Sequence, residues 1–525
     1  MQPIGKARIE TEVLDLSVLM SGGLRGITAV AGPTERGEVG KPRLVASWAE
    51  YVSVFGGLLT TDDFPFYCKR ALERQGRLLV CRLGHYTDIN DKETLTGDKA
   101  TGTVIIATET TGVSVQVEVE AKSIGIWGNR VSLRGNPAFS GIAGAIDLTI
   151  RLDGSPDATE VIKDIVPGTT DEILAFTVRS QLVNFVSIAA STLAGTGDIY
   201  LTGGVDTDEL TLEDYIGSSI GETGIHAFDG SIEANKMAIP GKAIPALDYA
   251  LAQYAEKRGD MRAILRTPTG ISGYVGIDYR EVRSPFSGAQ AIDTWYASMI
   301  FGTITVVDPL IIGGTKDISP IGDVLGIFTS RDTKFREWYA GAGFKRGRLF
   351  NVLSIPYNLD ATARLGEADL VDSRGLNMVI NHHTFGPVYW GNGTLQKRDT
   401  LLKHENVAEL VIFLVRNLPR FIETELFEPN DPTTWKTIYR NVKPFLDSVK
   451  TGRGYYDYLW QGDQEVDTID ECVVNRPEWI DAGKYTARLF IKPIAALKYI
   501  ALGVVVTNSG VSFSVLGESE ELGVI

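Results

Sequence analysis

The stretch Lys236–Arg266, KMAIPGKAIPALDYALAQYAEKRGDMRAILR, decides the fold class. Its first residues, Lys236–Ile239, are predicted to form a short buried strand that a Pro-Gly pair ends. Pro245–Arg258 is predicted to be a helix, because its apolar side chains recur at helical spacing and a glycine follows it. Met261–Arg266 is then the next strand. This order of strand, helix and strand indicates parallel pairing with a right-handed crossover.

The same α/β pattern occurs nearer the start of the chain. Gly26–Ala31 has the composition of a short apolar strand. Ser47 is predicted to cap a helix that ends at Phe55, where two glycines follow. Pro65 is predicted to start a second helix, and Arg77–Leu83 to form the next buried strand. We therefore expect an α/β middle domain built from two separated parts of the chain.

The segment between these two parts has a different character, rich in Thr, Val and Gly. Valines alternate with polar residues along Val113–Val119, and apolar residues alternate in the same way along Leu148–Leu152. Alternation of this kind is typical of half-buried strands. A single helix is predicted near Asp171–Leu182. The segment is therefore predicted to be a β-rich insertion.

The last third of the chain, from about Asn377, favours helices followed by strands. Asp399–Leu426 is predicted to be a long amphipathic helix kinked at Pro419. Asp431 is predicted to cap a second long helix, because proline follows it directly. The apolar face of this second helix carries Trp435, Ile438, Val442, Phe445 and Val449. Further strands are predicted at Tyr485–Lys492 and Leu497–Val506.

With 525 residues, the chain is too long for one compact core. We expect a multidomain protein of mixed α/β and α+β class. The expected parts are an N-terminal arm at residues 1–20, an α/β middle domain at 21–95 and 200–375, a β-rich inserted domain at 96–199, an α+β C-terminal domain at 376–506, and a C-terminal arm at 507–525.

Each end of the chain carries one alternating strand with no partner beside it in the sequence. The two strands are predicted at Ala7–Asp15 and Val511–Val515, and glycines flank both. The alternating residues of the two strands are Ile9, Thr11, Val13, Val511, Phe513 and Val515. A tethered strand is suited to adding onto the edge of another sheet, which makes these six residues candidates for contacts between subunits. The pattern equally allows each strand to pair within its own subunit.

Charge and composition exclude several kinds of partner. The net charge is −15, and an acidic surface repels nucleic-acid phosphates, so no direct nucleic-acid partner is expected. No run of about 18 apolar residues and no secretory signal is present, so we expect synthesis in the cytoplasm and no membrane insertion. The chain has three cysteines and no CxxC pair. Cys68, Cys81 and Cys472 are either reduced thiols or a source of a disulfide between subunits.

Motifs for catalysis or metal binding are incomplete. His382 and His383 are adjacent, and neighbouring strand residues face opposite sides, so a shared metal is not expected. His404-Glu405 begins like HExxH but lacks the second histidine, because residue 408 is alanine. Gly217–Gly221 matches GxSxG around Ser219, yet no buried strand precedes it as a nucleophile elbow requires. We expect no catalytic residue, metal or cofactor, although a serine hydrolase that uses Ser219 is kept as an alternative.

Two further features lie between residues 341 and 348. Gly341–Gly347 has one residue too many for the dinucleotide motif GxGxxG. Lys345, Arg346 and Arg348 form the densest basic cluster of the chain, with aromatic residues nearby. This basic cluster could bind phosphate or contact another subunit.

Several segments together resemble tail sheath proteins of contractile-tailed bacteriophages. They are SGGLRGITAVAGPTERG from Ser21, WAEYVSVFGG from Trp48, GIWGNR from Gly125, LTGGVD from Leu201, PIGDVLGIFTSRD from Pro320, and DPTTW from Asp431 with the strand after Tyr485. They cover nearly the whole chain in the order of the family. One departure follows Arg331-Asp332, where the family often has a segment ending in Pro-Ala and this chain has Ala340–Gly343.

This resemblance implies a structural subunit in a virion tail, assembled in the host cytoplasm. Such subunits polymerise helically, in stacked six-fold rings, around a tail tube, with the C-terminal domain inside and the inserted domain outside. The arms at the two chain ends would link neighbouring copies. Implied partners are other copies of the chain, the tail tube protein, and the baseplate and tail terminator proteins. The sheath of a bacteriocin-like or extracellular contractile injection particle is an alternative.

Overall fold

The computed structural model describes residues 26–497, except positions 75, 109–113, 139, 141, 143–144, 154–158, 167–169, 232 and 357–364. An eight-stranded central sheet has the strand order β17-β16-β13-β12-β11-β1-β3-β2. Six of its strands run parallel, and the edge strands β17 and β2 are antiparallel. The bounds are β1 Ile27–Gly32, β2 Arg43–Val45, β3 Arg77–Arg82, β11 Lys236–Ala238, β12 Arg262–Arg266, β13 Ala297–Phe301, β16 Leu376–His382 and β17 Gly386–Tyr389.

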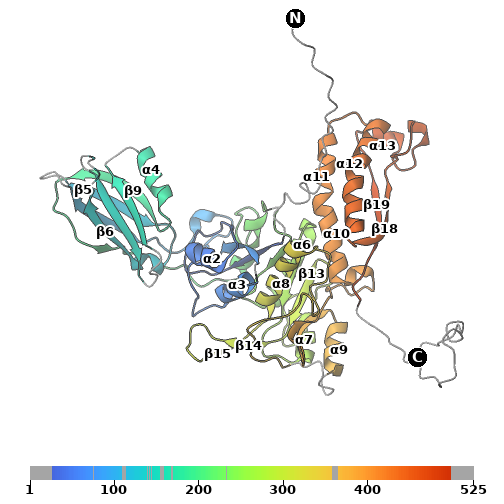
Figure 1. The fold of residues 1–525 in the computed structure, drawn as a ribbon, viewed down its shortest axis with the longest axis horizontal. Coiled ribbons are helices and arrows are strands. Elements are labelled where there is room, and N and C mark those ends of the chain that lie inside the picture. The colour runs from blue at the N-terminus through green and yellow to red at the C-terminus, as the bar shows by residue number, and fades with distance from the viewer. Residues whose placement is uncertain are drawn as a thin grey trace, which may run out of the picture.

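Helices cover both faces of the central sheet (Figure 1). Ala29 and Val30 of β1 are both buried and belong to separate apolar cores, because neighbouring strand residues point to opposite faces. One core is completed by α6 (Pro245–Arg258), α7 (Gly273–Arg280) and α9 (Leu365–Ser373). The other core is completed by α2 (Trp48–Phe55), α3 (Phe64–Leu72) and α8 (Ile321–Lys334). The predicted α/β middle domain is thus confirmed as a sheet with helices on both sides.

Local signals in the sequence place several elements correctly. The Ser47 hydroxyl accepts a hydrogen bond from the Glu50 amide and caps α2, and Gly56 ends that helix at a φ of 85°. β11 pairs with β12 in parallel, and α6 connects them, as predicted for Lys236–Arg266.

The inserted segment forms two sheets, with strand orders β4-β5-β9 and β10-β6-β7-β8. Its elements are β4 Thr101–Ala107, β5 Ser114–Ala121, β6 Val131–Pro137, β7 Ile146–Leu152, β8 Thr159–Ile165, α4 Thr170–Arg179, β9 Val183–Ser191 and β10 Ile199–Tyr200. Both sheets contribute side chains to one apolar core, which includes Val117, Leu133 and Ile150. The insert lies to one side of the central sheet, opposite the C-terminal helices (Figure 1).

The C-terminal region packs helices against a two-stranded sheet. Its elements are α10 Glu405–Asn417, α11 Pro419–Ile422, α12 Pro432–Thr451, β18 Tyr455–Gln461, α13 Pro477–Asp481 and β19 Arg488–Pro493. Asp431 caps α12, and the five apolar residues predicted to share a face of that helix are all buried. The helix predicted from Asp399 is wrong at its start, because residues 401–403 form a separate 3₁₀ turn and α10 begins only at Glu405.

Strand pairing in the central sheet places the start of the C-terminal region later in the sequence than predicted. The C-terminal domain was expected to begin at residue 376, but β16 pairs with β13 and β17 pairs with β16. Both strands therefore belong to the central sheet, and the C-terminal helices begin after Tyr389. Pairing of β13 with β16 joins residues about 75 positions apart, which local patterns do not reveal.

Three further short elements are α5 Leu212–Ile216 and the hairpin of β14 Ile304–Val307 and β15 Thr315–Ile318. The predicted strands at Ala7–Asp15 and Val511–Val515 lie outside the described residues, as does all but the first residue of the strand predicted at Leu497–Val506. Of the helices that are described, none combines the length and the apolar character needed to cross a membrane.

Candidate functional site

A cluster of charged side chains is buried where α10 meets the central sheet. Lys236 on β11 and Arg262 on β12 come from adjacent strands, and both are fully buried. The cluster also contains Arg331 and Asp332 at the end of α8, Glu337 in the following turn, and Glu405 and Glu409 on α10. We call this group the ionic joint.

Glu409 lies at the centre of the ionic joint. Its carboxylate is 2.8 Å from Nη1 of Arg262, 3.3 Å from Nζ of Lys236 and 3.5 Å from Nη2 of Arg331. Asp332 is 2.6 Å from Lys236 and 2.6 Å from Arg331. Each cation therefore forms an ion pair with at least one carboxylate of α8 or α10. These ion pairs connect strands β11 and β12, helix α8 and helix α10 in one network.

Burial and charge act in opposite directions on the carboxylates of the joint. Burial disfavours the charged form of Glu409, but the charges of Lys236, Arg331 and Arg262 outweigh it and lower its pKa to about 2. Burial raises the pKa of Glu405, which Arg262 only partly offsets. Removing one partner of such a network costs about 3–5 kcal/mol, because the remaining charge is left buried and unpaired. The joint therefore fixes one position of α10 on the sheet.

The insert is joined to the central domain in a different way. Nη1 of Arg82, at the end of β3, donates to the carbonyl oxygens of Gly37 at 2.9 Å and Ile124 at 3.0 Å. The Gly37 amide donates to the hydroxyl of Ser123 at 3.1 Å. The GIWGNR segment follows directly, and its Trp127 is buried. The Arg82 side chain, backbone groups and a partly exposed ion pair between Arg130 and Glu35 thus make this second junction, which we call the insert joint.

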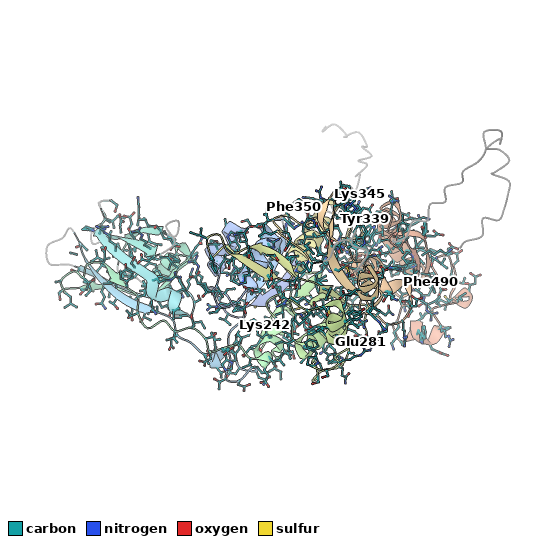
Figure 2. All side chains as sticks on the ribbon, turned by 90° about the horizontal axis from the view of Figure 1, so that it is seen from below. Lys242, Glu281, Tyr339, Lys345, Phe350 and Phe490 are labelled. Atoms are coloured by element: carbon teal, nitrogen blue, oxygen red, sulfur yellow. The ribbon has the colours of Figure 1, made fainter. Side chains whose placement is uncertain are left out.

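The two-stranded sheet of the C-terminal region has open edges. Among the described residues, β18 and β19 pair only with each other. Tyr455 and Trp460 of β18 are buried in the core that α12 completes. On the opposite face the sheet exposes large apolar side chains, and Phe490 is visible at the surface in Figure 2. The exposed fractions are 71% for Tyr456, 53% for Leu459 and 50% for Phe490.

The backbone at the open edges of this sheet can bind an additional strand. Unpaired N–H and C=O groups at an edge accept an additional strand, and a lone pair of strands is only marginally stable. The β18–β19 sheet is therefore a candidate assembly site. The six arm residues predicted for such contacts, namely Ile9, Thr11, Val13, Val511, Phe513 and Val515, lie outside the described residues and stay a prediction.

The incomplete catalytic motifs have structural explanations. Ser219 is exposed in a turn after helix α5, so no strand leads into the GxSxG sequence. Gly341 packs against Phe328, where a Cβ atom would lie 2.8 Å from the ring, so the tight approach of this glycine serves packing. In the described part of the chain, no group of three or more His, Cys, Asp or Glu residues is placed to hold a metal ion.

One detail of the histidine prediction is wrong. The rings of His382 and His383 do not point to opposite sides but stack at a centroid distance of 4.4 Å. The reason is that β16 ends at His382, so His383 already belongs to the turn and no longer follows strand alternation.

The cysteines are unequal in exposure. Cys68 and Cys81 are buried, and burial raises the pKa of Cys81 to about 12. Cys472 is partly exposed. Both buried thiols therefore agree with the reduced alternative, and only Cys472 is accessible enough for a disulfide between copies.

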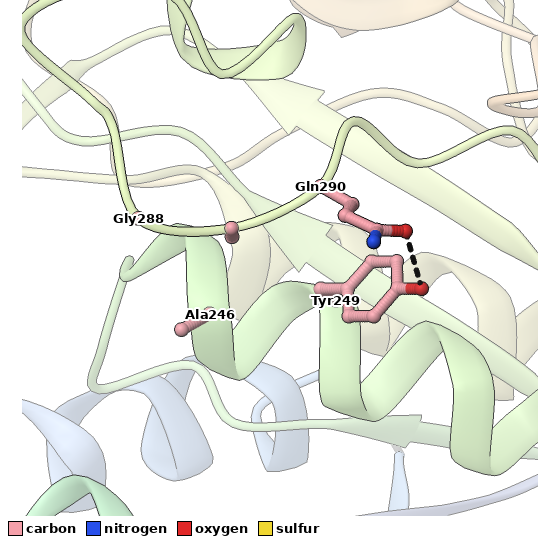
Figure 3. Close-up of a pocket in the computed structure, with 5 residues that line it drawn as sticks. Ala246, Tyr249, Gly288 and Gln290 are labelled. Atoms are coloured by element: carbon pink, nitrogen blue, oxygen red, sulfur yellow. Dashed lines mark hydrogen bonds between the residues drawn. The ribbon is translucent and has the colours of Figure 1, made fainter.

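A pocket of about 450 Å³ lies between α6 and the loop at residues 288–290. The residues that line it are Ala246, Tyr249, Gly288, Ala289 and Gln290 (Figure 3). The Tyr249 hydroxyl donates to the Gln290 side chain at 3.0 Å. None of these five residues carries a charged side chain.

The sheets and helices define a multidomain α/β fold with a β-rich insert and a helical C-terminal region. No family model matches the chain. A tail sheath protein of Enterobacteria phage T4 is 25% identical over 194 residues, which is 37% of this chain and 28% of that protein. A tail sheath protein of Vibrio phage KVP40 is also 25% identical over 194 residues, 37% of this chain and 27% of that protein. The match thus spans less than a third of the length of these curated relatives.

Solved structures agree over nearly the whole chain. The sheath tail protein Lin1278 from Listeria innocua has a TM-score of 0.58 at 14% identity, covering 90% of this chain and 96% of that one. The helical sheath of the anti-feeding prophage in its contracted state has a TM-score of 0.53 at 12% identity, covering 92% and 93%. These similarities establish the fold. The predicted resemblance to tail sheath proteins is confirmed.

Proposed function

We propose that the chain is the structural subunit of a contractile tail sheath. It polymerises as a helix around an inner tube and contracts to drive that tube through a host cell envelope. The sequence similarity to two phage tail sheath proteins carries the proposal. The fold similarity to a contracted helical sheath supports it over most of the chain.

Strand addition is the proposed means of assembly. The arms predicted at Ala7–Asp15 and Val511–Val515 would each add to an edge of the β18–β19 sheet of a neighbouring copy. Each added strand of about five backbone hydrogen bonds, at roughly 0.5–1.5 kcal/mol per bond, contributes a few kcal/mol per junction. A contact between two different surfaces does not close on itself, so repetition of it produces a helix.

Contraction is proposed to move each subunit as rigid parts. The ionic joint keeps α10 on the central sheet, so the central domain and the C-terminal helices move together. The strand junctions between copies would hold while subunits rotate. The extended sheath would be trapped kinetically, and new packing between copies would supply the energy without nucleotide hydrolysis.

The remaining partners follow from this role. They are the tail tube protein inside the sheath and the baseplate and tail terminator proteins at its ends, with the subunit located in the virion tail and synthesised in the host cytoplasm. No enzymatic activity is part of the proposal. The same chemistry would serve the sheath of a bacteriocin-like or extracellular injection particle, and the fold similarity to the anti-feeding prophage sheath fits that alternative equally.

Negative-stain electron microscopy of the purified full chain tests the proposal. Wild-type protein should form long hollow tubes of constant width. Deletion of residues 1–19 should abolish the tubes and leave monomers with an unchanged circular dichroism spectrum, because the arm is lost and the domains remain. Normal tubes from the deletion variant would contradict the arm mechanism. Labelling of wild type by a fluorophosphonate probe, lost in Ser219→Ala, would instead support a hydrolase.

A further inference from the structure

An aromatic and basic surface lies on the central domain beside β16 and β17. We define the aromatic–basic patch as Phe344, Lys345, Arg348, Phe350, Phe385 and Trp390. Phe344 contacts Phe385 at a ring-centroid distance of 4.5 Å and Trp390 at 5.1 Å. Phe350 is 61% exposed, and Lys345 and Phe350 lie on the same face of the molecule in Figure 2. Large aromatic groups thus remain in contact with water.

Within the described part of the chain, the two cations of the patch form no ion pair with an acidic side chain. Lys345 and Arg348 are exposed, and among the described residues no carboxylate lies within 4.0 Å of either. The guanidinium of Arg348 instead lies 5.9 Å from the ring centre of Phe385, and that of Arg74 lies 4.9 Å from that of Phe350. The patch is therefore positively charged on a protein whose net charge is −15.

A surface of opposite character lies in the C-terminal region. The acidic loop, residues 423–431, reads ETELFEPND and connects the end of α11 to α12. Phe427 is fully exposed and has a φ of 72°, a conformation that bulky residues rarely adopt. Glu423 and Glu428 are exposed beside it. An apolar ring thus projects between carboxylates, which is the complement of the patch.

One copy of the chain keeps these two surfaces apart. Trp390 of the patch follows Tyr389, whose hydroxyl contacts Glu405 at the first turn of α10. The acidic loop lies beyond the other end of that helix. The 13 residues of α10 span roughly 20 Å at 1.5 Å per residue, so the loop lies well away from the patch.

We propose that the acidic loop of one copy docks on the aromatic–basic patch of a second copy. Phe427 would pack against Phe344 and Phe385, and the glutamates beside it would pair with Lys345 and Arg348. Because the two surfaces differ, the contact is heterologous and propagates from copy to copy. This inference rests on the proposed sheath function and adds to it a contact that does not involve the chain-end arms.

Charge reversal and charge exchange test the contact in the full chain. Lys345→Glu/Arg348→Glu should raise the protein concentration needed for tube formation at least tenfold, and Glu423→Lys/Glu428→Lys should do the same. Equal mixing of these two variants should restore assembly, because each then supplies one surface that matches the other. Lys163→Glu/Lys257→Glu, which changes the same charge at exposed sites elsewhere, should assemble like wild type. Unchanged assembly by both reversal variants would overturn the contact.

Cross-linking tests the same contact directly. Phe427→Cys/Phe385→Cys in a Cys472→Ser background, treated with a short bismaleimide, should give a ladder of covalent multimers. Each single cysteine variant should stay monomeric. Tubes that form normally and give no ladder would overturn the inference while leaving the sheath proposal intact, whereas a complete absence of tubes from wild type would count against the sheath proposal itself. Retention of wild type on heparin, lost in Lys345→Glu/Arg348→Glu with tubes unaffected, would assign the patch to a polyanion instead.

Discussion

The ionic joint and the insert joint each attach another part of the chain to the central domain, and they do so through different interactions. The ionic joint attaches α10 through three buried cations and four buried carboxyl groups, and its ion pairs are as short as 2.6 Å. The insert joint attaches a whole β domain through one buried arginine, Arg82, hydrogen bonds to backbone groups, and a partly exposed ion pair between Arg130 and Glu35. The free-energy cost of losing a partner is larger for a buried charge than for a buried neutral group.

This difference shows which parts of the molecule are bound to move together. The ionic joint favours one arrangement of α10, since a displacement would leave buried charges unpaired. The insert joint loses only a few hydrogen bonds when it opens, and water can replace them. We therefore expect the C-terminal helices to keep their position on the central sheet, and the insert to change its position more easily.

The largest effect is expected from Arg331→Met. This change leaves Asp332 and Glu409 short of a cation inside the ionic joint, so the free energy of unfolding should fall by about 3–5 kcal/mol in urea denaturation. Lys334→Met, one turn along α8 and exposed, should leave the unfolding curve unchanged. Equal stability of the two variants would show that the joint does not hold α10.

The pKa of a buried carboxyl group with no cation in contact should be raised, whereas that of Glu409 is lowered. Asp248 on α6 accepts a hydrogen bond from the Tyr279 hydroxyl at 2.5 Å, and burial raises its pKa to about 7, with Tyr279 and the more distant Arg266 opposing the rise. A carboxyl group with a raised folded pKa stabilises the protein below that pKa, and this stability is lost as the pH rises from about 4 to 7.

The substitution Asp248→Asn removes the contribution that the titration of Asp248 makes to the free energy of unfolding. Relative to the variant, wild type should gain about 2.5 kcal/mol in unfolding free energy when the pH falls from 8 to 5. Glu256→Gln, exposed on the same helix, should follow the wild-type pH profile. Parallel pH profiles for wild type and Asp248→Asn would refute the assigned titration.

A smaller effect is expected from Arg82→Met at the insert joint. Loss of the guanidinium removes hydrogen bonds to the buried carbonyl group of Ile124 and the part-buried one of Gly37, which costs about 2 kcal/mol. Hydrogen exchange should accelerate around Ser123–Arg130 while the ionic joint keeps its protection. Arg77→Met on the same strand should show no such change. Faster exchange throughout the chain would mean that the insert is not independently attached.

The smallest effect is expected at the N-terminal cap of helix α2. Ser47→Ala removes the cap of α2 and should lower the unfolding free energy by about 1 kcal/mol. Ser47→Asp retains an acceptor at the same position and should be neutral. A loss as large as that of Arg331→Met would show that the joints are no stronger than an ordinary helix cap.

Local patterns predicted the elements well because their causes are local. Helix α2 follows from Ser47 and the two glycines after Phe55, and the β11-α6-β12 unit follows from periodicity over 31 residues. The start of α10 was missed because the 3₁₀ turn at residues 401–403 depends on tertiary contacts, such as the pairing of Gly393 with His404.

The ionic joint was not predicted at all. Lys236 and Glu409 are separated by more than 170 positions, and neither belongs to a motif. The available signals were a lysine at the start of a strand that is otherwise apolar, and two glutamates at i, i+4 on the buried face of a helix. Each signal alone also fits a solvent-exposed residue, so only the fold brings them together.

The central claim is that subunits are joined by strands added to the open edges of β18–β19. Helical reconstruction by cryo-electron microscopy of tubes formed by the purified full chain tests it most directly. We expect additional strands, contributed by neighbouring copies, on the free edges of β18 and β19. Tubes in which both edges of this sheet face solvent, or a purified chain that forms no tubes, would contradict it.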